Sequence, residues 1–127
     1  KILINRDDYV ELLTSSDAYT IIYNGRIVCC AGVYELTETI GRVWAVLSQD
    51  SGECLMSITK AIRAFLCKQS YARIETPVRR DYAQGHRWCR LLGFTNETPE
   101  MGMRKYGFEG DTYDLYAYFP QEKRCQT

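Results

Sequence analysis

The sequence predicts one domain over residues 1–127, of the α/β (α+β) class, with a central mixed, twisted sheet of six or seven strands flanked by helices. Three observations lead to this prediction. Strand-like runs and amphipathic helical runs alternate along the whole chain. Asn24-Gly25 stands between two strand-like runs, which is the strongest short signal for a β-hairpin. A strand at residues 41–48 passes through a glycine-containing turn directly into a helix.

In the first half of the chain, the spacing of apolar residues places one helix and four strands. Tyr9, Leu12 and Leu13 form a one-sided apolar stripe, which indicates a helix from about residue 5 to residue 13. The strands expected around this helix lie at residues 2–4, 19–23, 26–34 and 42–47.

In the second half, helical spacing predicts two helices. The first covers residues 52–68, with Leu55, Ile58 and Ile62 on its apolar face. The second begins at the capping residue Asp81 and stops at Gly93. The side chains expected to point inward from this second helix are Trp88, Leu91 and Leu92.

The remaining strands are expected at residues 71–77, 101–106 and 112–119, the last two forming a terminal hairpin. Alternation places Tyr116 and Tyr118 on the same face of that hairpin. A tyrosine-rich face of this kind is either a partner-binding surface or the cap of a substrate channel.

The charges of the chain balance, with 16 basic and 16 acidic residues. Nothing in the overall charge indicates binding to nucleic acid or to an anionic membrane. No apolar run approaches the roughly 20 residues of a membrane-spanning helix, and the start lacks a secretory leader pattern. One local cluster is either a solvated face or a contact for phosphates or an acidic partner: Arg73, Arg79, Arg80, Arg87 and Arg90.

The chain has six cysteines, none in a C-x-x-C pair, and His86 is its single histidine, so the standard zinc spacings are absent. A disulfide framework fits less well than buried thiols in a chain with this much core. Reduced cysteines that pack as small hydrophobic residues are therefore expected, which indicates a cytoplasmic protein.

Residues 49–54 read Gln-Asp-Ser-Gly-Glu-Cys and connect the central strand to the following helix. A strand that turns into a helix in this way directs backbone N–H groups and a helix dipole at one spot, which suits a phosphate. The alternative is an ordinary helix start, with Ser51 or Asp50 as the cap.

Together with the order of elements, this segment resembles the Gcn5-related N-acetyltransferases (GNAT superfamily). The resemblance implies an acetyl-coenzyme A cofactor, held by the strand end and the loop: Val46, Leu47, Gln49, Ser51, Gly52, Glu53 and Cys54. Gln49 and Gly52 match the family pattern. Cys54 replaces a smaller residue, and Asp50 and Glu53 bring negative charge to the phosphate loop.

The second helix ends Leu92-Gly93-Phe94, as in the same family. The position of the family's tyrosine, which protonates the departing thiolate, is occupied by Cys89, and the family's asparagine by Tyr82. Cys89 either passes this proton or packs as a small apolar residue. The residues from Gly85 to Phe94, with those near 103–106 and 111–117, are similar to phage and prophage acetyltransferase-like proteins, a group that includes the internal virion protein of podoviruses.

Acetyl transfer to an amine requires the amine to lose a proton, commonly to a glutamate or an ordered water. Glu75 is the best-placed candidate, followed by Glu35 and Glu38, and each has the alternative of an ordinary surface carboxylate. His86 is expected on the surface of its helix. Trp44 is either core or one wall of an acceptor pocket.

Two functions follow from these residues. The first is an acetyl-coenzyme A-dependent N-acetyltransferase, whose amine acceptor is a small molecule or a protein. The second is a catalytically inactive phage protein that keeps the fold and binds a virion protein or a second copy of itself, in the host cytoplasm or the virion. Neither interpretation involves a membrane, and nucleic-acid binding rests on the arginine cluster alone.

Overall fold

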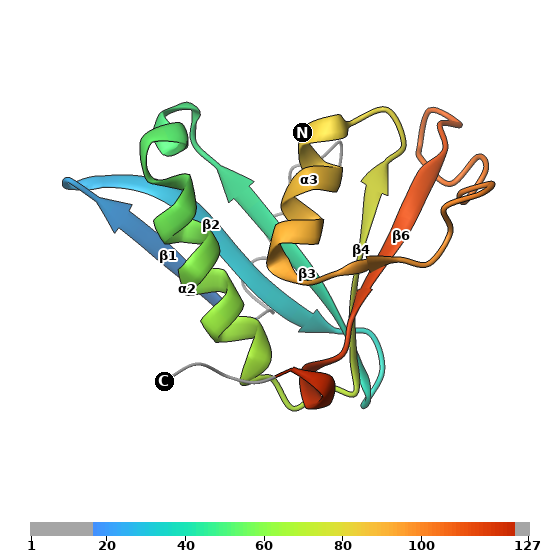
Figure 1. Cartoon of the computed structure of the whole chain (residues 1–127), viewed down its shortest axis with the longest axis horizontal. Helices are drawn as coiled ribbons and strands as arrows, with labels where there is room; N and C mark the ends of the chain where they lie inside the picture. The colour runs from blue at the N-terminus through green and yellow to red at the C-terminus, as the bar shows by residue number, and fades with distance from the viewer. Residues whose placement is uncertain (1–16, 124–127) are drawn as a thin grey trace.

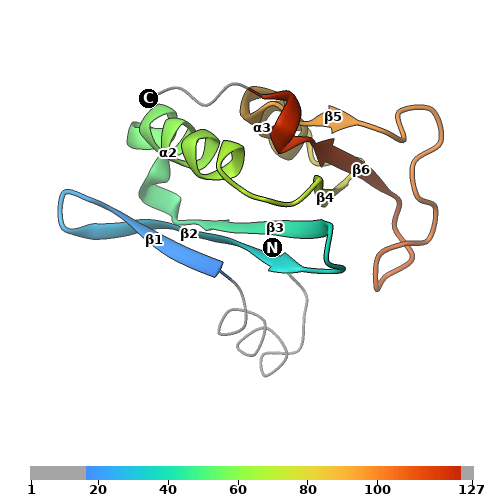
Figure 2. The ribbon, with the colours of Figure 1, turned by 90° about the horizontal axis from the view of Figure 1, so that it is seen from below.

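The computed structural model describes residues 17–123 (Figures 1 and 2). The strand predicted at residues 2–4 and the helix predicted up to residue 13 lie outside this range. The described elements are β1 (Asp17–Tyr23), β2 (Arg26–Glu35), β3 (Ile40–Leu47), the 3-10 helix η1 (Gln49–Cys54), α2 (Leu55–Cys67), β4 (Arg73–Arg79), α3 (Ala83–Leu92), β5 (Thr95–Asn96), β6 (Tyr113–Tyr118) and the 3-10 helix η2 (Pro120–Glu122).

The described strands form one six-stranded mixed sheet, as the sequence predicted, and the strand order is β1-β2-β3-β4-β6-β5. Figure 2 shows α2 and α3 together on one face of this sheet. None of the helices within residues 17–123 is both long and apolar enough to cross a membrane.

The predicted hairpin at Asn24-Gly25 is confirmed. β1 and β2 pair antiparallel, and both turn residues have positive φ, 51° at Asn24 and 75° at Gly25. Two positive φ angles define the type I′ turn, whose twist matches that of the flanking strands. The pairing shifts by one residue between Ile21 and Ile22, so that Val28 has no partner on β1 and the strand bulges there.

β3 and β4 run parallel, but they pair over three residues only: Ile40 with Arg73, Gly41 with Ile74, and Arg42 with Glu75. Beyond this point the two strands diverge toward their carboxyl ends (Figure 1). We call the space between them the split, and the end at which β3 and β4 terminate its open end. The split divides the sheet into one half with β1, β2 and β3 and another with β4, β6 and β5.

The hydrophobic core lies between the sheet and the two helices. α2 contributes Ile58, Ile62 and Leu66, which are at most 2% exposed and lie on the apolar face that the spacing predicted. Full burial of such a side chain stabilises the fold by about 1.5–3 kcal/mol. From the sheet, Val33 and Ile74 complete the contact with this face.

The terminal hairpin predicted at residues 101–106 and 112–119 is wrong in its first arm. Residues 101–106 contribute a single bridge, from Met103 to Tyr113, and β6 pairs with β4 and β5 instead. The backbone has positive φ at Gly102 (68°) and Lys105 (59°), and such residues interrupt an extended strand.

The tyrosine-rich surface is also corrected. Tyr116 is 1% exposed and Tyr118 is 3% exposed, and both belong to the core cluster under the helices. Alternation correctly placed Tyr116 and Tyr118 on one face of the strand, but this face points into the core. It is therefore neither a partner-binding surface nor the cap of a channel.

The second predicted helix has the expected end and a different start. Gly93 follows α3 with a φ of 97°, which is the left-handed conformation typical of a glycine that ends a helix. The N-cap residue is Tyr82 rather than Asp81, and it makes no side-chain capping bond. Leu91 is 50% exposed, whereas Cys89 and Leu92 are buried. The strand predicted at residues 71–77 lies two residues later, as β4.

Three of the four free cysteines in the described range are buried, as predicted, and Cys30 is partly buried. Cys67 departs from the prediction of reduced thiols, because it is disulfide-bonded.

Candidate functional site

The open end of the split is formed by the ends of two strands and the starts of two helices. α2 and α3 both begin at this end, as Figure 1 shows. The N-cap side chains, Cys54 and Tyr82, form no capping hydrogen bond, and neither first turn contains an acidic residue. The first amides of a helix have no partner within the helix and carry a partial positive charge, so the start of α3 suits an anion, whereas α2 continues directly from η1.

The loop between β3 and α2 is a 3-10 helix, η1, rather than an open turn. The Ser51 amide donates to the Ser48 carbonyl at 3.2 Å, and the Cys54 thiol donates to the Ser51 carbonyl at 3.6 Å. The N-cap residue of α2 is Cys54 and not Ser51, which corrects that alternative, and the side chain of Asp50 lies outside the described part of the structure. Ser51 is buried and its amide already donates to Ser48, so Ser51 is poorly placed to donate a hydrogen bond to a phosphate.

Other predicted cofactor residues of the loop face the β1–β2 hairpin. Gln49, Gly52 and Glu53 line a hollow of about 540 Å³. The opposite wall comes from the hairpin and consists of Tyr23, Asn24, Arg26 and Val28. Within the described residues, the lining of this hollow comes from the hairpin and η1, and none of it comes from β4 or α3. Val46 and Leu47, at the end of β3, are 41% and 37% exposed.

On the helix side, a hydrogen bond connects the two halves of the molecule. The indole Nε1 of Trp88 on α3 donates to Thr59 Oγ1 on α2 at 3.0 Å. Thr59 is 3% exposed and in turn donates to the Leu55 carbonyl at 2.7 Å. Trp88 therefore bridges α2 and α3.

Glu75 lies in a chain of ion pairs at the point where β3 and β4 separate. Its carboxylate accepts from Arg42 Nη2 and from Arg73 Nε, each at 2.9 Å, and Arg73 also pairs with Glu97 at 2.6 Å. Burial raises the pKa of Glu75, but the hydrogen bonds from Arg42 and Arg73 outweigh it and hold the pKa below its ordinary value. This arrangement favours a structural ion pair over a proton acceptor.

Cys89 is 6% exposed on the sheet-facing side of α3. Burial raises the pKa of its thiol to about 12, and the nearby charge of Arg90 lowers it only partly. A thiol with this pKa holds its proton more tightly than an ordinary thiol leaving group, whose pKa is about 8.5. The environment of Cys89 thus suits packing better than proton donation.

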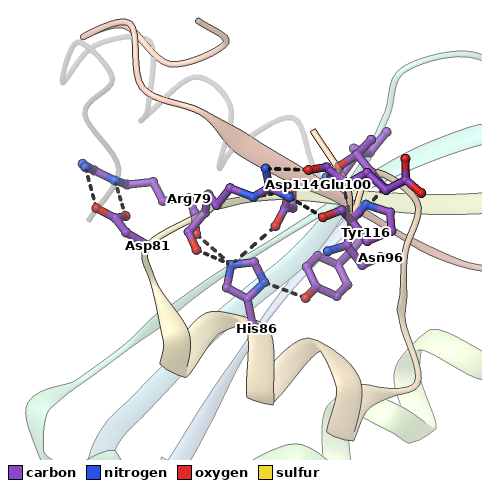
Figure 3. A network of polar contacts seen from close by, with 11 residues as sticks. Arg79, Asp81, His86, Asn96, Glu100, Asp114 and Tyr116 are labelled. Atoms are coloured by element: carbon purple, nitrogen blue, oxygen red, sulfur yellow. Dashed lines mark hydrogen bonds and ion pairs between the residues drawn. The ribbon is translucent and has the colours of Figure 1, made fainter. Parts of the chain in front are cut away.

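His86 was expected on the surface and is instead half-buried in a network of polar contacts, shown in Figure 3. Its Nε2 lies 2.9 Å from the Arg79 carbonyl, so this nitrogen carries the hydrogen. Nδ1 lies 2.6 Å from the Tyr116 hydroxyl, within hydrogen-bond distance. Asp114 Oδ2 lies 3.8 Å from Nε2, and its Oδ1 pairs with Arg80 Nε at 3.4 Å.

This network was missed in the sequence. One signal was available: Asp114, Tyr116 and Tyr118 alternate on one face of β6, and an aspartate at an inward-facing position indicates a buried polar contact. Asp114 is indeed 3% exposed.

The arginine cluster is largely neutralised within the protein. Arg73 pairs with Glu75 and Glu97, Arg79 pairs with Asp81 and Asp111, and Arg80 pairs with Asp114 and also donates to the Pro99 carbonyl. Arg87 and Arg90 are exposed on α3. Three of the five arginines therefore have carboxylate partners of their own, which leaves less charge for phosphates.

The other predicted residues are separate from the open end. Trp44 is 9% exposed, so it is buried as expected. It does not, however, belong to the main core cluster. Glu35 and Glu38 are exposed at and beyond the end of β2. In residues 17–123, no group of three or more His, Cys, Asp or Glu side chains could hold a metal ion.

The fold described above is similar to that of several solved acetyltransferases. The spermidine N-acetyltransferase chimera from Vibrio cholerae and a human enzyme has a TM-score of 0.69 at 11% identity, with 91% of this chain and 77% of that one covered. The ribosomal-protein-S5-alanine acetyltransferase from Vibrio fischeri has a TM-score of 0.65 at 16% identity, covering 92% and 69%.

A ribosomal L7/L12 α-N-protein acetyltransferase, solved with coenzyme A, has a TM-score of 0.67 at 14% identity, covering 91% and 68%. At these identities the likeness establishes the fold, which is that of the GNAT acetyltransferases. No protein-family model and no curated protein matches the sequence.

Proposed function

We propose that this protein binds acetyl-coenzyme A at the open end of the split and transfers the acetyl group to an amine. The observation that carries the proposal is the divergence of β3 and β4 after three pairs, directly beneath two helix starts without capping side chains. A thioester arm fits between diverging strands, and a diphosphate fits the partial positive charge at the start of a helix. One structural neighbour was solved with coenzyme A.

When bound, the cofactor supplies an activated acetyl group and a thiol leaving group. The chain's own part is to position the acceptor amine and to move two protons. Glu75 is a weak base while two arginines hold its pKa low, and Cys89 is a weak acid with a pKa of about 12. Transfer therefore depends mainly on orientation, with water as the proton carrier.

A second function is supported by a different observation. The Trp88–Thr59 bridge joins the helices beside the split, and both predicted catalytic side chains are occupied with structural contacts. These features suit a domain that keeps the fold as a binding module. The narrower resemblance to phage proteins, a virion partner and the acceptor all remain predictions from the sequence, as does a cytoplasmic location.

The test is binding of acetyl-coenzyme A, measured by calorimetry and by thermal shift on the full chain. A ligand at a hundred times its dissociation constant adds about 2.7 kcal/mol to stability. The variant Gly52→Asp places a carboxylate beside the start of α2 and should abolish the shift. Gly52→Ala is the matched control, because a Cβ at Gly52 has no neighbour within 4 Å.

Release of free thiol with a panel of amines, including an N-terminal peptide and spermidine, then tests transfer. Binding with amine-dependent thiol release supports the enzyme. Binding without release supports a module that retains only the cofactor. The absence of any thermal shift, with Gly52→Asp behaving as the wild type, would overturn the proposal.

A further inference from the structure

The outer surface of the two helices carries positive charge and no negative charge. Figures 1 and 2 show α2 and α3 side by side on one face of the sheet, so one side of each helix points away from the sheet. Neither helix contains an aspartate or a glutamate. Their exposed charged side chains are Lys60, Arg63, Arg87 and Arg90. A chain whose charges balance overall therefore presents a surface of one sign here.

These cations differ from the arginines of the sheet in their partners. Within residues 17–123, four arginines in or next to the strands pair with carboxylates: Arg42, Arg73, Arg79 and Arg80. No carboxylate of the same range pairs with Lys60, Arg63 or Arg87. Burial raises the pKa of Tyr116 and the nearby Arg90 lowers it in part, so Arg90 already has a contact inside the protein. Lys60, Arg63 and Arg87 are thus the cations left for a partner.

The spacing of the cations along each helix is unfavourable for the free protein. Lys60 and Arg63 are three residues apart on α2, as are Arg87 and Arg90 on α3. Residues at this spacing are neighbours on the helix surface, and like charges there weakly destabilise the helix. A helix side that meets only water commonly interleaves acidic side chains, which remove this repulsion. Neither helix has such an acid, and a bound anion would supply one.

Exposed apolar side chains lie one turn away from the cations. Met56, four residues before Lys60, is 62% exposed, and Leu91, four residues after Arg87, is 50% exposed. Residues four apart lie on the same side of a helix. Methionine and arginine are both enriched at protein–protein interfaces. We call the outward side of the two helices, with Met56, Lys60, Arg63, Arg87 and Leu91, the helix surface.

The hydrogen bond from Trp88 to Thr59 brings the two parts of the helix surface together. Arg63 follows Thr59 by four residues, so it lies one turn further along the side of α2 that meets α3. Arg87 directly precedes Trp88 on α3. The cations of the two helices therefore adjoin one helix–helix contact and do not belong to two separate surfaces.

We infer that the helix surface binds an acidic amphipathic helix of another protein. Carboxylates of this partner pair with Lys60, Arg63 and Arg87, and its apolar side chains cover Met56 and Leu91. Arginine offers a planar fork that matches a carboxylate, and recognition of a helix commonly uses apolar anchors about one turn apart. The inference does not depend on acetyl transfer, because the helix surface lies on the outside of the helices and not in the split.

A nucleic acid fits the same surface less well. The chain has 16 basic and 16 acidic residues, so it has no net charge to attract a polyanion from a distance. Contacts to a phosphate backbone come from polar and cationic groups, and they would leave Met56 and Leu91 exposed. An acidic helix with an apolar side satisfies both kinds of side chain.

The experiment measures binding of labelled probes to the full chain by fluorescence anisotropy. The probes are synthetic helical peptides with glutamates on one side and leucines on the other, a scrambled peptide of the same composition, and a short duplex DNA. We expect the amphipathic peptides to bind more tightly than the scrambled peptide and the DNA. In NMR, they should shift the amides of α2 and α3.

Variants then test the individual side chains. Lys60→Gln, Arg63→Gln and Arg87→Gln should each weaken peptide binding by up to about 5-fold, which corresponds to one exposed ion pair. Met56→Gln should also weaken it, because the peptide loses an apolar contact. The matched controls are Arg104→Gln and Phe108→Gln, since both side chains are exposed in the loop between β5 and β6.

Acetyl-coenzyme A provides the last arm of the test. It should not displace the peptide, and Arg63→Gln should leave any thermal shift with acetyl-coenzyme A unchanged, so failure of this inference and failure of the proposed function are distinguishable. The inference is overturned if the amphipathic peptides do not bind, if DNA binds more tightly, or if acetyl-coenzyme A displaces the peptide. Equal binding by the helix variants and the controls would also overturn it.

Discussion

Replacing Glu75 with glutamine tests whether this residue holds the two halves of the sheet together. Its side chain is 13% exposed, and those of Arg42 and Arg73 are 22% and 23% exposed. An exposed ion pair contributes about 0–1 kcal/mol, whereas removing one member of a fully buried pair costs about 3–5 kcal/mol. Because Glu75 lies between these limits and serves two arginines, we expect Glu75→Gln to cost about 2 kcal/mol.

The assay is urea unfolding followed by circular dichroism. With a slope of about 2 kcal/mol per molar, typical of a small domain, the midpoint should fall by about 1 M. Glu97→Gln removes only the more exposed end of the chain and should cost less than about 1 kcal/mol. Glu38→Gln is the matched control, since Glu38 is an exposed carboxylate.

The stability difference between the wild type and Glu75→Gln should also depend on pH. The folded pKa of Glu75 is lowered, so its contribution is fully present above the unfolded value of about 4.3 and is lost as pH falls through the folded pKa. The difference between wild type and Glu75→Gln should therefore shrink below about pH 4. A cost equal to that of Glu38→Gln, or a difference unchanged at pH 3, would refute the structural role. Loss of acetyl transfer with unchanged stability would instead identify Glu75 as the base.

Three further predictions concern the helices and the thiols. Trp88→Phe keeps a ring but loses the hydrogen bond to Thr59, so the unfolding free energy should fall by about 1 kcal/mol, and an unchanged urea midpoint would contradict the bridge. Gly93→Ala should cost about 1–2 kcal/mol in the same assay, because alanine must adopt the φ of 97°; a neutral result would mean that α3 ends differently. Among the four free cysteines within residues 17–123, iodoacetamide should modify Cys30 first and Cys89 very slowly at pH 8, as judged by peptide mass spectrometry. Early modification of Cys89 would contradict its burial.

The parts of the fold that could be predicted from the sequence depend on local signals. Asn24-Gly25 specifies its own turn because both residues tolerate positive φ, and Gly93 ends α3 for the same reason. The apolar face of α2 follows from 3.6-residue periodicity alone, and Ile58 and Ile62 are buried as expected. In each case the information lies within a few neighbouring residues.

The parts that could not be predicted depend on partners far away in the chain. Residues 101–106 alternate well enough for a strand, but β6 finds its partners in β4 and β5. Leu91 matches a helical apolar stripe, yet the sheet covers Cys89 instead. His86 has polar neighbours in sequence, while its hydrogen bond to Tyr116 spans 30 residues. The local sequence pattern predicts whether a segment is a helix or a strand, but it does not predict which part of the protein that segment packs against.

Two links join the two halves of the molecule, one in the sheet and one between the helices. At the closed end of the split, Arg42 and Glu75 form both the last parallel pair and an ion pair, so sheet pairing and charge attraction reinforce each other at one point. At the helix side, the halves are joined by the hydrogen bond from Trp88 to Thr59, which is neutral and contributes only about 1 kcal/mol. Breaking the Trp88–Thr59 link would therefore remove one neutral hydrogen bond, whereas separation at Glu75 would break the ion pair to Arg42 together with the last pair of the parallel ladder. The glutamate that family resemblance assigned to catalysis thus lies where an ion pair reinforces the pairing of β3 with β4, and the link at Trp88, which the resemblance does not mark, is the weaker of the two.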